Sequence, residues 1–532
     1  MKNTNYVFYI VILIIALISS FLRPIYSWDL DHEMYFGSRL LAGELIWTKE
    51  FHDKLPFVPF IFLVPAYFKS VYVFKIISII SIFIFSCLLL YLPNKIFTKT
   101  RNANERLVFS SLVFFLLLYF SYDSIETINC IAVSFYGASF LLILYDSFSS
   151  KVRTLSDKCL VLFFGSCFGA MAISIRPYYI AGLGVALVGS IFLSQNNVPA
   201  GDRLVNFRKF LKSSAWGVAI GVWGGVLNVL PYALTGQMSA FHDGLSMLSE
   251  HINPHSGVHD FFERVRKFPD ILLWGSWILI AVYIFYLSKL HACIEKCHEY
   301  KIFWASTLSA LATVIYVVSQ HYWWHYIQLF FANYCICIAC VLCLIQAPSV
   351  VRIPFKRNLE TQTQFLYRIF LTVACVFLLF ELKKEISISE SIRNKNTVFW
   401  QSTRYNWQED LFRDYLEKRY ANSRPSFLFP DDMKAHWLLG ESRHHFPHSA
   451  NTWHIFVGWW KNITFRSPHF FVMSNGEQYC EKIRSNGPDM IVVQPDSLLL
   501  PCMRSASSGY QMESVLENPV GKIVIFRRTV QP

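Results

Sequence analysis

The sequence predicts a polytopic α-helical membrane protein with a C-terminal soluble α/β domain. Hydrophobic residues make up 54% of the 532 residues, and only 16% are charged. Apolar runs recur along the first 380 residues, and many approach the length of about 20 residues that a membrane-spanning helix needs. Soluble cytosolic, fibrous and disordered proteins have other compositions, so these classes are excluded.

About eleven apolar runs, separated by charged breaks, are expected to cross the membrane. They lie near residues 6–22, 71–92, 107–121, 128–146, 159–175, 177–194, 214–234, 271–288, 302–319, 326–346 and 366–380. Arg176-Pro177 divides the apolar stretch 159–194 into two spans, because proline breaks helices and a charge within a span is costly. The first run ends at Arg23-Pro24 without a small-residue cleavage pattern, so we interpret it as an uncleaved span.

The basic residues indicate the orientation. With a cytoplasmic N-terminus, about 19 Lys and Arg lie on the cytoplasmic side against about 7 acids, and the opposite loops before residue 381 carry about 10 against 13. The net charge of +12 therefore follows the positive-inside rule, so we expect membrane lipids as partners and no nucleic acid. The loops 23–70 and 235–270 and everything after about residue 381 are then outside.

Residues 381–532 are predicted to form a separate extracytoplasmic domain after the transmembrane domain 1–380. Short strand-like runs at 426–429, 490–493 and 523–526 are punctuated by Asn-Gly, Gly-Pro and Asn-Pro pairs, as is typical of a compact α/β domain. Cys480 and Cys502 are the only cysteines after residue 381. In an oxidising compartment these two are expected to form a disulfide.

The first outside loop contains a dense group of ionisable side chains. These are Asp29, Asp31, His32, Glu33, His52, Asp53 and Lys54. Ionisable residues held between membrane-embedded segments need a reason, and a helix beginning at Asp29 would favour ionised carboxylates near its N-terminal end. N-capping and solvation at the interface would explain the same residues without any chemistry.

Two motifs in this loop resemble the first periplasmic loop of GT-C superfamily glycosyltransferases. They read Asp29-Leu-Asp-His-Glu-Met-Tyr35-Phe-Gly37-Ser-Arg-Leu-Leu41-Ala-Gly43 and His52-Asp53-Lys54-Leu55-Pro56. The branch they resemble is related to protein O-mannosyltransferases and the aminoarabinose transferase of lipid A. Leu30 stands where a second acid is frequent, and Leu55 where a proline is usual. The spacing to Gly43 favours Asp29 over Asp31 as the working acid, but both remain candidates.

The resemblance extends along most of the chain. Ser124-Ile-Glu126 looks like the short acidic turn of the family, and Gln320-His-Tyr-Trp-Trp-His325-Tyr326-Ile-Gln328-Leu resembles its late His-Tyr motif. In the last domain, His436-Trp-Leu-Leu-Gly440-Glu-Ser-Arg443 is similar to a turn found in some relatives. Each motif alone is weak evidence for the resemblance, but together, in this order along the chain, the motifs are stronger evidence.

The resemblance implies an inverting transferase that moves a sugar from a polyprenyl-phosphate donor to a hydroxyl acceptor on the outer face. Asp29 or Asp31 would be the base. Lys54, His325, Tyr326 and Arg176 would bind the donor phosphate, and Glu126, His32 and His52 would contact sugar or acceptor. The acceptor would be an envelope glycan, lipid or protein, and the membrane a bacterial inner membrane. No nucleotide diphosphate needs neutralising, so no cofactor or metal is required.

Simpler interpretations exist for each residue. Lys54 can place its ammonium at the interface, His325 and Tyr326 can belong to an aromatic belt, Arg176 can cap a hairpin, and Glu126 can lie on a solvated turn. The histidines at 242, 251, 255 and 259 suggest a metal site, but Pro254 and Gly257 interrupt their helical spacing. A flippase or permease for a lipid-linked sugar is the alternative function, and a polysaccharide polymerase or ligase is a third.

The segment 57–68 is apolar, but it follows Pro56, contains Pro59 and Pro65, and is too short to span the membrane. We expect it to lie in the outer interface and to hold Lys54 at the depth of the lipid phosphates.

Overall fold

The structure is a computed structural model, and its described residues fall into two compact units. With short internal gaps, the described ranges are 33–48, 54–96, 110–117, 128–148, 154–193, 203–251, 257–290, 297–344, 415–428 and 489–529. The first unit holds the described residues of 75–228 and 257–344. The second holds those of 33–74, 229–251 and 415–529. The spans predicted at 6–22 and 366–380, and the domain boundary predicted near residue 380, lie outside the described residues.

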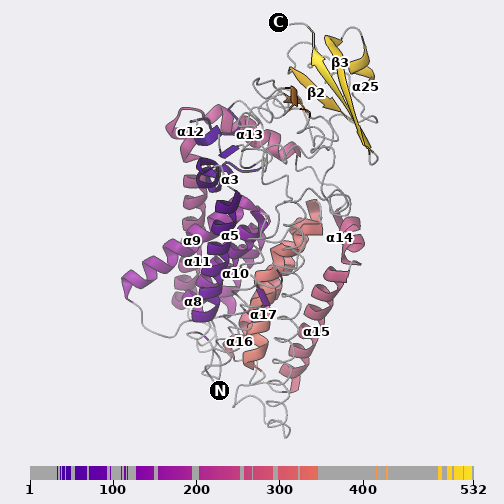
Figure 1. The fold of residues 1–532 in the computed structure, drawn as a ribbon. Helices are drawn as coiled ribbons and strands as arrows, with labels where there is room; N and C mark the ends of the chain where they lie inside the picture. Colours follow the sequence, from indigo (N-terminus) through magenta and orange to yellow (C-terminus); the bar gives the residue numbers. More distant parts are fainter. Residues whose placement is uncertain are drawn as a thin grey trace. The chain divides into compact units, whose positions relative to one another are not determined.

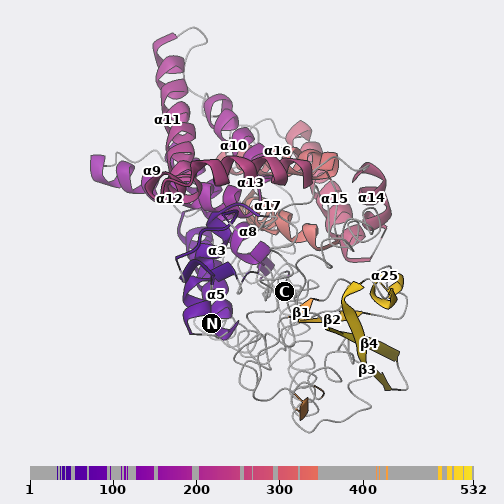
Figure 2. The same ribbon diagram turned by 90° about the horizontal axis from the view of Figure 1, so that it is seen from above.

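Helices, most of them long and apolar, make up the first unit (Figures 1 and 2). They are α5 (Val71–Tyr91), whose first turn belongs to the second unit, α8 (Ile128–Phe148), α9 (Leu155–Ile175), α10 (Tyr179–Leu193), α11 (Arg203–Asn228), α14 (Gly257–Val265), α15 (Phe268–Leu290), α16 (His298–Gln320), the 3-10 helix η3 (Trp324–Phe330) and α17 (Phe331–Leu344). Within the described residues, six helices are long and apolar enough to cross a membrane. The chain is therefore an integral membrane protein. Eight of the eleven predicted spans coincide with these helices, and the total of eleven stays a prediction.

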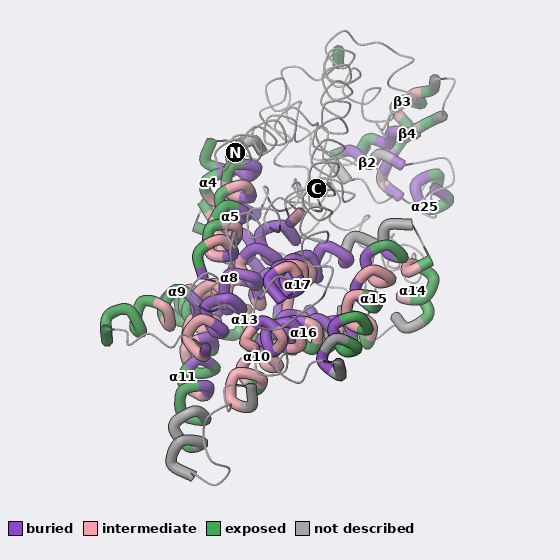
Figure 3. The backbone as a smooth tube through the Cα atoms, turned by 90° about the horizontal axis from the view of Figure 1, so that it is seen from below, coloured by how far each residue is buried: buried purple, intermediate pink, exposed green. Residues whose placement is uncertain are grey.

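Helix α8 lies at the core of the first unit. In its most apolar 18-residue stretch, 89% of the residues are buried, whereas the corresponding stretch of α11, within Phe210–Asn228, has only 11% of its residues buried. Helix α8 packs against α9, α10, η3 and α17, and Figure 3 shows α8 and α17 largely buried while α11 and α15 carry long exposed stretches. The exposed residues on α11 and α15 include large apolar side chains such as Val218 and Leu279. An apolar surface of this kind is what lipid chains cover.

Hydrogen bonds between buried polar groups join the inner helices. The Tyr136 hydroxyl of α8 lies 2.6 Å from the Ser309 hydroxyl of α16, which donates to the Gly182 carbonyl of α10 at 2.6 Å. The Asn333 amide of α17 donates to the Ser306 carbonyl of α16 at 3.0 Å. Small and polar residues are typical of helix interfaces in membranes, where unsatisfied polar groups are costly.

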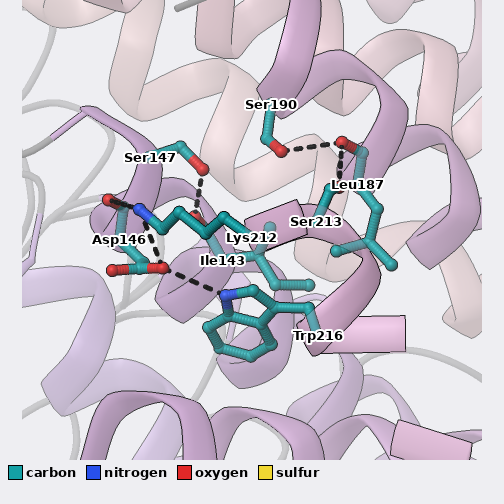
Figure 4. A network of polar contacts seen from close by, with 8 residues as sticks. All are labelled: Ile143, Asp146, Ser147, Leu187, Ser190, Lys212, Ser213 and Trp216. Atoms are coloured by element: carbon teal, nitrogen blue, oxygen red, sulfur yellow. Dashed lines mark hydrogen bonds and ion pairs between the residues drawn. The ribbon is translucent and has the colours of Figure 1, made fainter. Parts of the chain in front are cut away.

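A second set of polar contacts fixes the C-terminal end of α8 to α11 (Figure 4). Lys212 Nζ donates to the Asp146 carbonyl oxygen at 2.6 Å and lies 3.0 Å from Asp146 Oδ2, and Trp216 Nε1 donates to the same Oδ2 at 3.0 Å. We call Asp146, Lys212 and Trp216 the Asp146 cluster. One turn of α11 places Lys212 and Trp216 on the same face, so a single carboxylate receives both.

The second unit contains short helices and a sheet. These are α3 (Phe57–Ile61), α4 (Leu63–Tyr67), α12 (Leu230–Leu234), α13 (Met238–His251), α25 (Leu500–Arg504), β1 (Phe427–Leu428), β2 (Met490–Val493), β3 (Tyr510–Asn518) and β4 (Gly521–Arg528). The segment 57–68 thus forms two helices of five residues each, which are too short to span, as predicted.

The sheet has the order β1-β2-β4-β3. Strand β1 is parallel to β2, and the β2/β4 and β4/β3 pairs are antiparallel. Strands β1, β2 and β4 confirm the three predicted strands. Strand β3 was not predicted, because its sequence is mostly polar and contains an irregularity between Met512 and Ser514 that interrupts the alternation of faces.

Candidate functional site

Helix α9 ends at the Arg176-Pro177 pair, as predicted. Arg176 is the C-cap residue, and its φ of −137° and ψ of 97° are extended, the conformation that a following proline favours. The Arg176 amide still donates to the Ala172 carbonyl at 2.8 Å, and the Tyr179 amide donates to the Arg176 carbonyl at 3.1 Å. The chain therefore leaves one helix and enters the next within a single turn, and the Arg176 side chain departs from the path of α9.

Arg176 reaches the first turn of α8. Its Nε donates to Asn129 Oδ1 at 2.5 Å. Asn129 is fully buried, whereas Arg176 is half-buried. The hydrogen bond fixes the direction of the guanidinium relative to the core helix of the unit.

The His-Tyr motif places Tyr326 beside Arg176. The connector between α16 and α17 forms the 3-10 helix η3, in which Tyr326 and Leu329 lie on one face because side chains three residues apart eclipse. The guanidinium carbon of Arg176 lies 5.5 Å from the centre of the Tyr326 ring, within the range of a cation–π contact. The Tyr179 hydroxyl donates to the Leu329 carbonyl at 3.0 Å, so the Arg176 turn is attached to η3 at two points.

Tyr178 completes this group of side chains. Its hydroxyl lies 3.4 Å from the Tyr326 hydroxyl, and its ring packs against Tyr326 and Tyr316. A tyrosine hydroxyl keeps its proton at neutral pH, so the Tyr178 hydroxyl can donate a hydrogen bond. We call Asn129, Arg176, Tyr178 and Tyr326 the Arg176 cluster.

The chemistry of the Arg176 cluster suits an anion. An amide oxygen and an aromatic ring are neutral, so these two contacts orient the guanidinium without cancelling its charge. Guanidinium groups bind phosphate oxygens in a bidentate manner, and hydroxyl and amide donors add further hydrogen bonds. The cluster therefore has the donors that a phosphate group requires.

In the second unit, the Leu-x-x-Gly part of the first-loop motif has a structural explanation. The Glu44 amide donates to the Arg39 carbonyl and the Gly43 amide to the Leu40 carbonyl, both at 3.0 Å, and Gly43 has a φ of +83°. This is the Schellman arrangement, in which a left-handed glycine ends a helix. The motif therefore fixes where the helical segment that includes residues 36, 37 and 39–41 ends.

Gly37 lets this helical segment approach α3 and α4 closely. A Cβ atom on Gly37 would lie 2.7 Å from the carbonyl oxygen of Phe62. Phe62 is the residue that separates the two short helices α3 and α4. Only glycine fits at this distance. Because Lys54 lies just before α3, this packing also fixes the position of Lys54 relative to the helical segment.

Lys54 forms an ion pair with Glu33. Lys54 Nζ lies 3.2 Å from Glu33 Oε1, and the two side chains are only 8% and 1% exposed. A buried cation and a buried carboxylate compensate each other's loss of hydration. Sequence reasoning selected Lys54 but saw Glu33 only as one acid among several in the loop, since the pairing depends on the loop that brings residues 33 and 54 together.

Trp47 anchors the middle of the same loop. It is fully buried against Tyr232 and Phe241, and its φ of +67° is unusual for a residue with a side chain. The Tyr232 hydroxyl donates to the Ile46 carbonyl. The two loops that the sequence places on the outer side, 23–70 and 235–270, therefore contact each other within the second unit.

The other predicted site residues are not described. Asp29, Asp31, His32, His52, Glu126 and Cys480 lie outside the described residues, as does the side chain of His325. Cys502 is disulfide-bonded, and its predicted pairing with Cys480 stays a prediction. Among the described residues, no three His, Cys, Asp or Glu side chains gather as a metal site would require.

Asn129 was missed by sequence reasoning. It stands at the start of an apolar run and looks like a polar residue at the end of a span. Only the fold shows that it contacts Arg176, which lies 47 residues later in the chain. A buried asparagine at the end of a span, near an arginine at the same end of another span, is the one signal that would have suggested it.

No protein-family model and no curated protein sequence matches the chain. The fold, however, is that of an integral membrane protein of the GT-C type. The chain is similar to two solved structures of ArnT from Cupriavidus metallidurans. The one bound to undecaprenyl phosphate has a TM-score of 0.58 and 11% identity over 99% of this chain and 98% of that chain. The apo structure has a TM-score of 0.58 and 13% identity over 99% of each chain.

ArnT belongs to the branch that the first-loop motifs resemble. The predicted GT-C-like fold class is therefore confirmed over nearly the whole length of the chain.

Proposed function

We propose that this chain is a membrane glycosyltransferase that moves a sugar from a polyprenyl-phosphate donor to a hydroxyl acceptor. The observation that carries the proposal is the likeness in fold, over nearly the whole length, to an ArnT structure bound to undecaprenyl phosphate. The Arg176 cluster supports it, because its cation and hydrogen-bond donors match a phosphate ligand.

In the proposed reaction, the bond between the anomeric carbon of the sugar and the phosphate oxygen breaks. The lipid phosphate leaves with the bonding electrons, so the leaving group needs positive charge and hydrogen-bond donors rather than a proton. Arg176, Tyr326, His325 and Lys54 are the proposed donors to this phosphate. The proposed chemistry includes no step that requires a metal.

The acceptor hydroxyl forms the new bond to the anomeric carbon from the opposite face, which inverts its configuration. Its proton passes to a carboxylate, for which we propose Asp29 or Asp31. Glu126, His32 and His52 are proposed to contact the sugar or the acceptor. These assignments rest on the first-loop and acidic-turn motifs.

Phosphate binding by Lys54 involves an exchange of partners. Lys54 is paired with Glu33, so a donor phosphate competes with this carboxylate for the ammonium group. When the phosphate is bound, the buried Glu33 carboxylate shares the positive charge of Lys54 with the phosphate, so its own negative charge is less well compensated. We therefore propose that Lys54 contributes less to donor affinity than a lysine without a carboxylate beside it would.

The proposed site faces the outer side of the membrane. We propose a bacterial inner membrane with a cytoplasmic N-terminus and a periplasmic C-terminal domain, on the basis of the positive-inside pattern. The acceptor is an envelope glycan, lipid or protein that presents a hydroxyl group.

The test is the release of free polyprenyl phosphate by purified protein supplied with polyprenyl-phosphate sugars and envelope acceptors. Release by the wild type that is lost in Asp29→Asn or in Asp31→Asn supports transfer chemistry and identifies the base. Lys212→Ala, whose side chain contacts Asp146 at the opposite end of α8 from Asn129, serves as the control for folding. If no donor is cleaved but labelled lipid changes leaflet in proteoliposomes, the chain is a permease and the proposal is wrong.

A further inference from the structure

The side chain of Asn129 has two polar atoms, and only one of them has a hydrogen-bond partner among the described residues. Its Oδ1 accepts the hydrogen bond from Arg176 Nε. Its Nδ2 is buried and has no hydrogen-bond partner within the described part of the chain. A buried amide N–H without an acceptor is costly, so its presence in the core helix needs an explanation.

The orientation of this amide follows from chemistry. An arginine Nε can only donate, so the atom of Asn129 that faces it must be the oxygen. Rotating the amide by 180° would place two donors against each other. The NH2 group therefore forms the other arm of the same amide, next to the oxygen that Arg176 contacts.

The surroundings indicate which acceptor these hydrogens meet. The guanidinium of Arg176 is held by Asn129 on one side and lies over the Tyr326 ring, with the Tyr178 and Tyr326 hydroxyls nearby. A cation and several donors around one point favour an acceptor that carries negative charge and more than one oxygen. A phosphate group has both properties.

We propose that Asn129 has two roles in the Arg176 cluster: it positions the Arg176 guanidinium through Oδ1 and donates from Nδ2 to the phosphate of the polyprenyl-phosphate donor. This proposal rests on the proposed function and assigns a residue that no sequence motif contains. Asn129 is thus a positioning residue for Arg176 and a ligand of the phosphate at the same time.

The test measures binding of radiolabelled undecaprenyl phosphate to the full chain in nanodiscs, together with the melting temperature. Asn129→Asp keeps an oxygen for Arg176 and replaces the NH2 donor with a charged oxygen. We expect the melting temperature to be maintained and the affinity to fall at least tenfold, because the NH2 donor is replaced by a carboxylate that repels the phosphate and compensates the charge of Arg176. A purely structural role for Asn129 would move the two readouts together.

Asn228→Asp is the matched control. Asn228 is a buried residue of the same unit, and its Nδ2 donates to the Ser174 hydroxyl at 2.7 Å and to the Gly224 carbonyl at 3.0 Å. This variant adds the same charge beside Ser174 instead of beside the Arg176 guanidinium, so its loss of affinity should be clearly smaller than that of Asn129→Asp. An equal loss in both variants would show a general effect of charge and would overturn the proposal.

Competing ligands separate the sources of the phosphate chemistry. Dodecyl phosphate should displace the label and polyprenol should not, and displacement by inorganic phosphate would show that the headgroup alone is enough. If the wild type binds and Asn129→Asp binds equally well, this inference is wrong and the proposed function stands. If the wild type binds no undecaprenyl phosphate, the proposed donor class is wrong and the inference falls with it.

Discussion

The two ends of helix α8 carry polar clusters of opposite design. Asn129 and Asp146 are 17 residues apart, which corresponds to about 26 Å along the helix. In the Asp146 cluster, one carboxylate receives both the lysine ammonium and the indole N–H, so charge and donors are matched within the protein. In the Arg176 cluster, the guanidinium contacts an amide oxygen and an aromatic ring, and the Asn129 Nδ2 has no hydrogen-bond partner among the described residues.

We propose that this difference separates a structural contact from a binding site. A matched cluster gains most of its interaction energy on folding, so its loss should reduce stability. A cluster that keeps an unused buried donor is expected to gain further interaction energy when a ligand binds, so its loss should reduce binding and activity. Substitutions at the two ends of α8 should therefore have different consequences.

Arg176→Ala should have the largest effect. The guanidinium is the proposed partner of the leaving phosphate, and removal of such a group costs about 100- to 1000-fold in rate, or roughly 3–4 kcal/mol. The assay is release of free polyprenyl phosphate per folded molecule. Arg176→Lys keeps the charge but not the bidentate geometry, so its rate should fall between those of the wild type and Arg176→Ala. Full activity in Arg176→Ala would place the phosphate elsewhere.

Asp146→Ala should lower stability instead. The buried Trp216 N–H and the Lys212 ammonium both lose their acceptor, at a cost of about 1–3 kcal/mol. The free energy of unfolding in a mixed-micelle denaturant titration measures this, and activity per folded molecule should stay unchanged. Lys212→Ala is the milder companion, since the Lys212 side chain is 47% exposed and its ion pair is screened by solvent. The distinction between the clusters fails if Asp146→Ala loses donor affinity while remaining folded.

Tyr326→Leu should have the smallest effect of the three. It removes the ring over which Arg176 lies, and such a contact contributes about 0.5–2 kcal/mol, or a few- to thirtyfold in donor affinity. Tyr326→Phe keeps the ring and removes only the hydroxyl, so the two variants divide the effect between the ring and the hydrogen bond. Binding of undecaprenyl phosphate is the measurement, and a larger loss in Tyr326→Phe than in Tyr326→Leu would show that the ring is not what holds Arg176.

Much of the fold could be predicted from the sequence, because membrane spans leave a strong compositional signal. The Arg176-Pro177 break followed from the chemistry of proline and is found where it was expected. Strand β3 was missed because it lacks an apolar run and gains its stability from pairing with β4 along its whole length.

The candidate site was less accessible to prediction. Arg176 and Tyr326 were both predicted to bind the donor phosphate, but their contact depends on the 3-10 helix η3. The apolar pattern did not distinguish η3 from the membrane span predicted at 326–346. Asn129 and Glu33 were not selected, because each acquires its role from a partner distant in the sequence. Hydropathy shows where the chain crosses the membrane, whereas polar contacts between spans appear only in three dimensions.

The most direct test of the account is to locate the lipid phosphate on the chain. An undecaprenyl phosphate analogue with a photoreactive group beside the phosphate would be cross-linked to the full protein in nanodiscs, and the labelled peptides mapped by mass spectrometry. We expect label on the peptides that contain Asn129, Arg176 and Tyr326, and its loss in the presence of excess undecaprenyl phosphate. Competed label at the Asp146 end of α8, with none at the Arg176 cluster, would contradict the account.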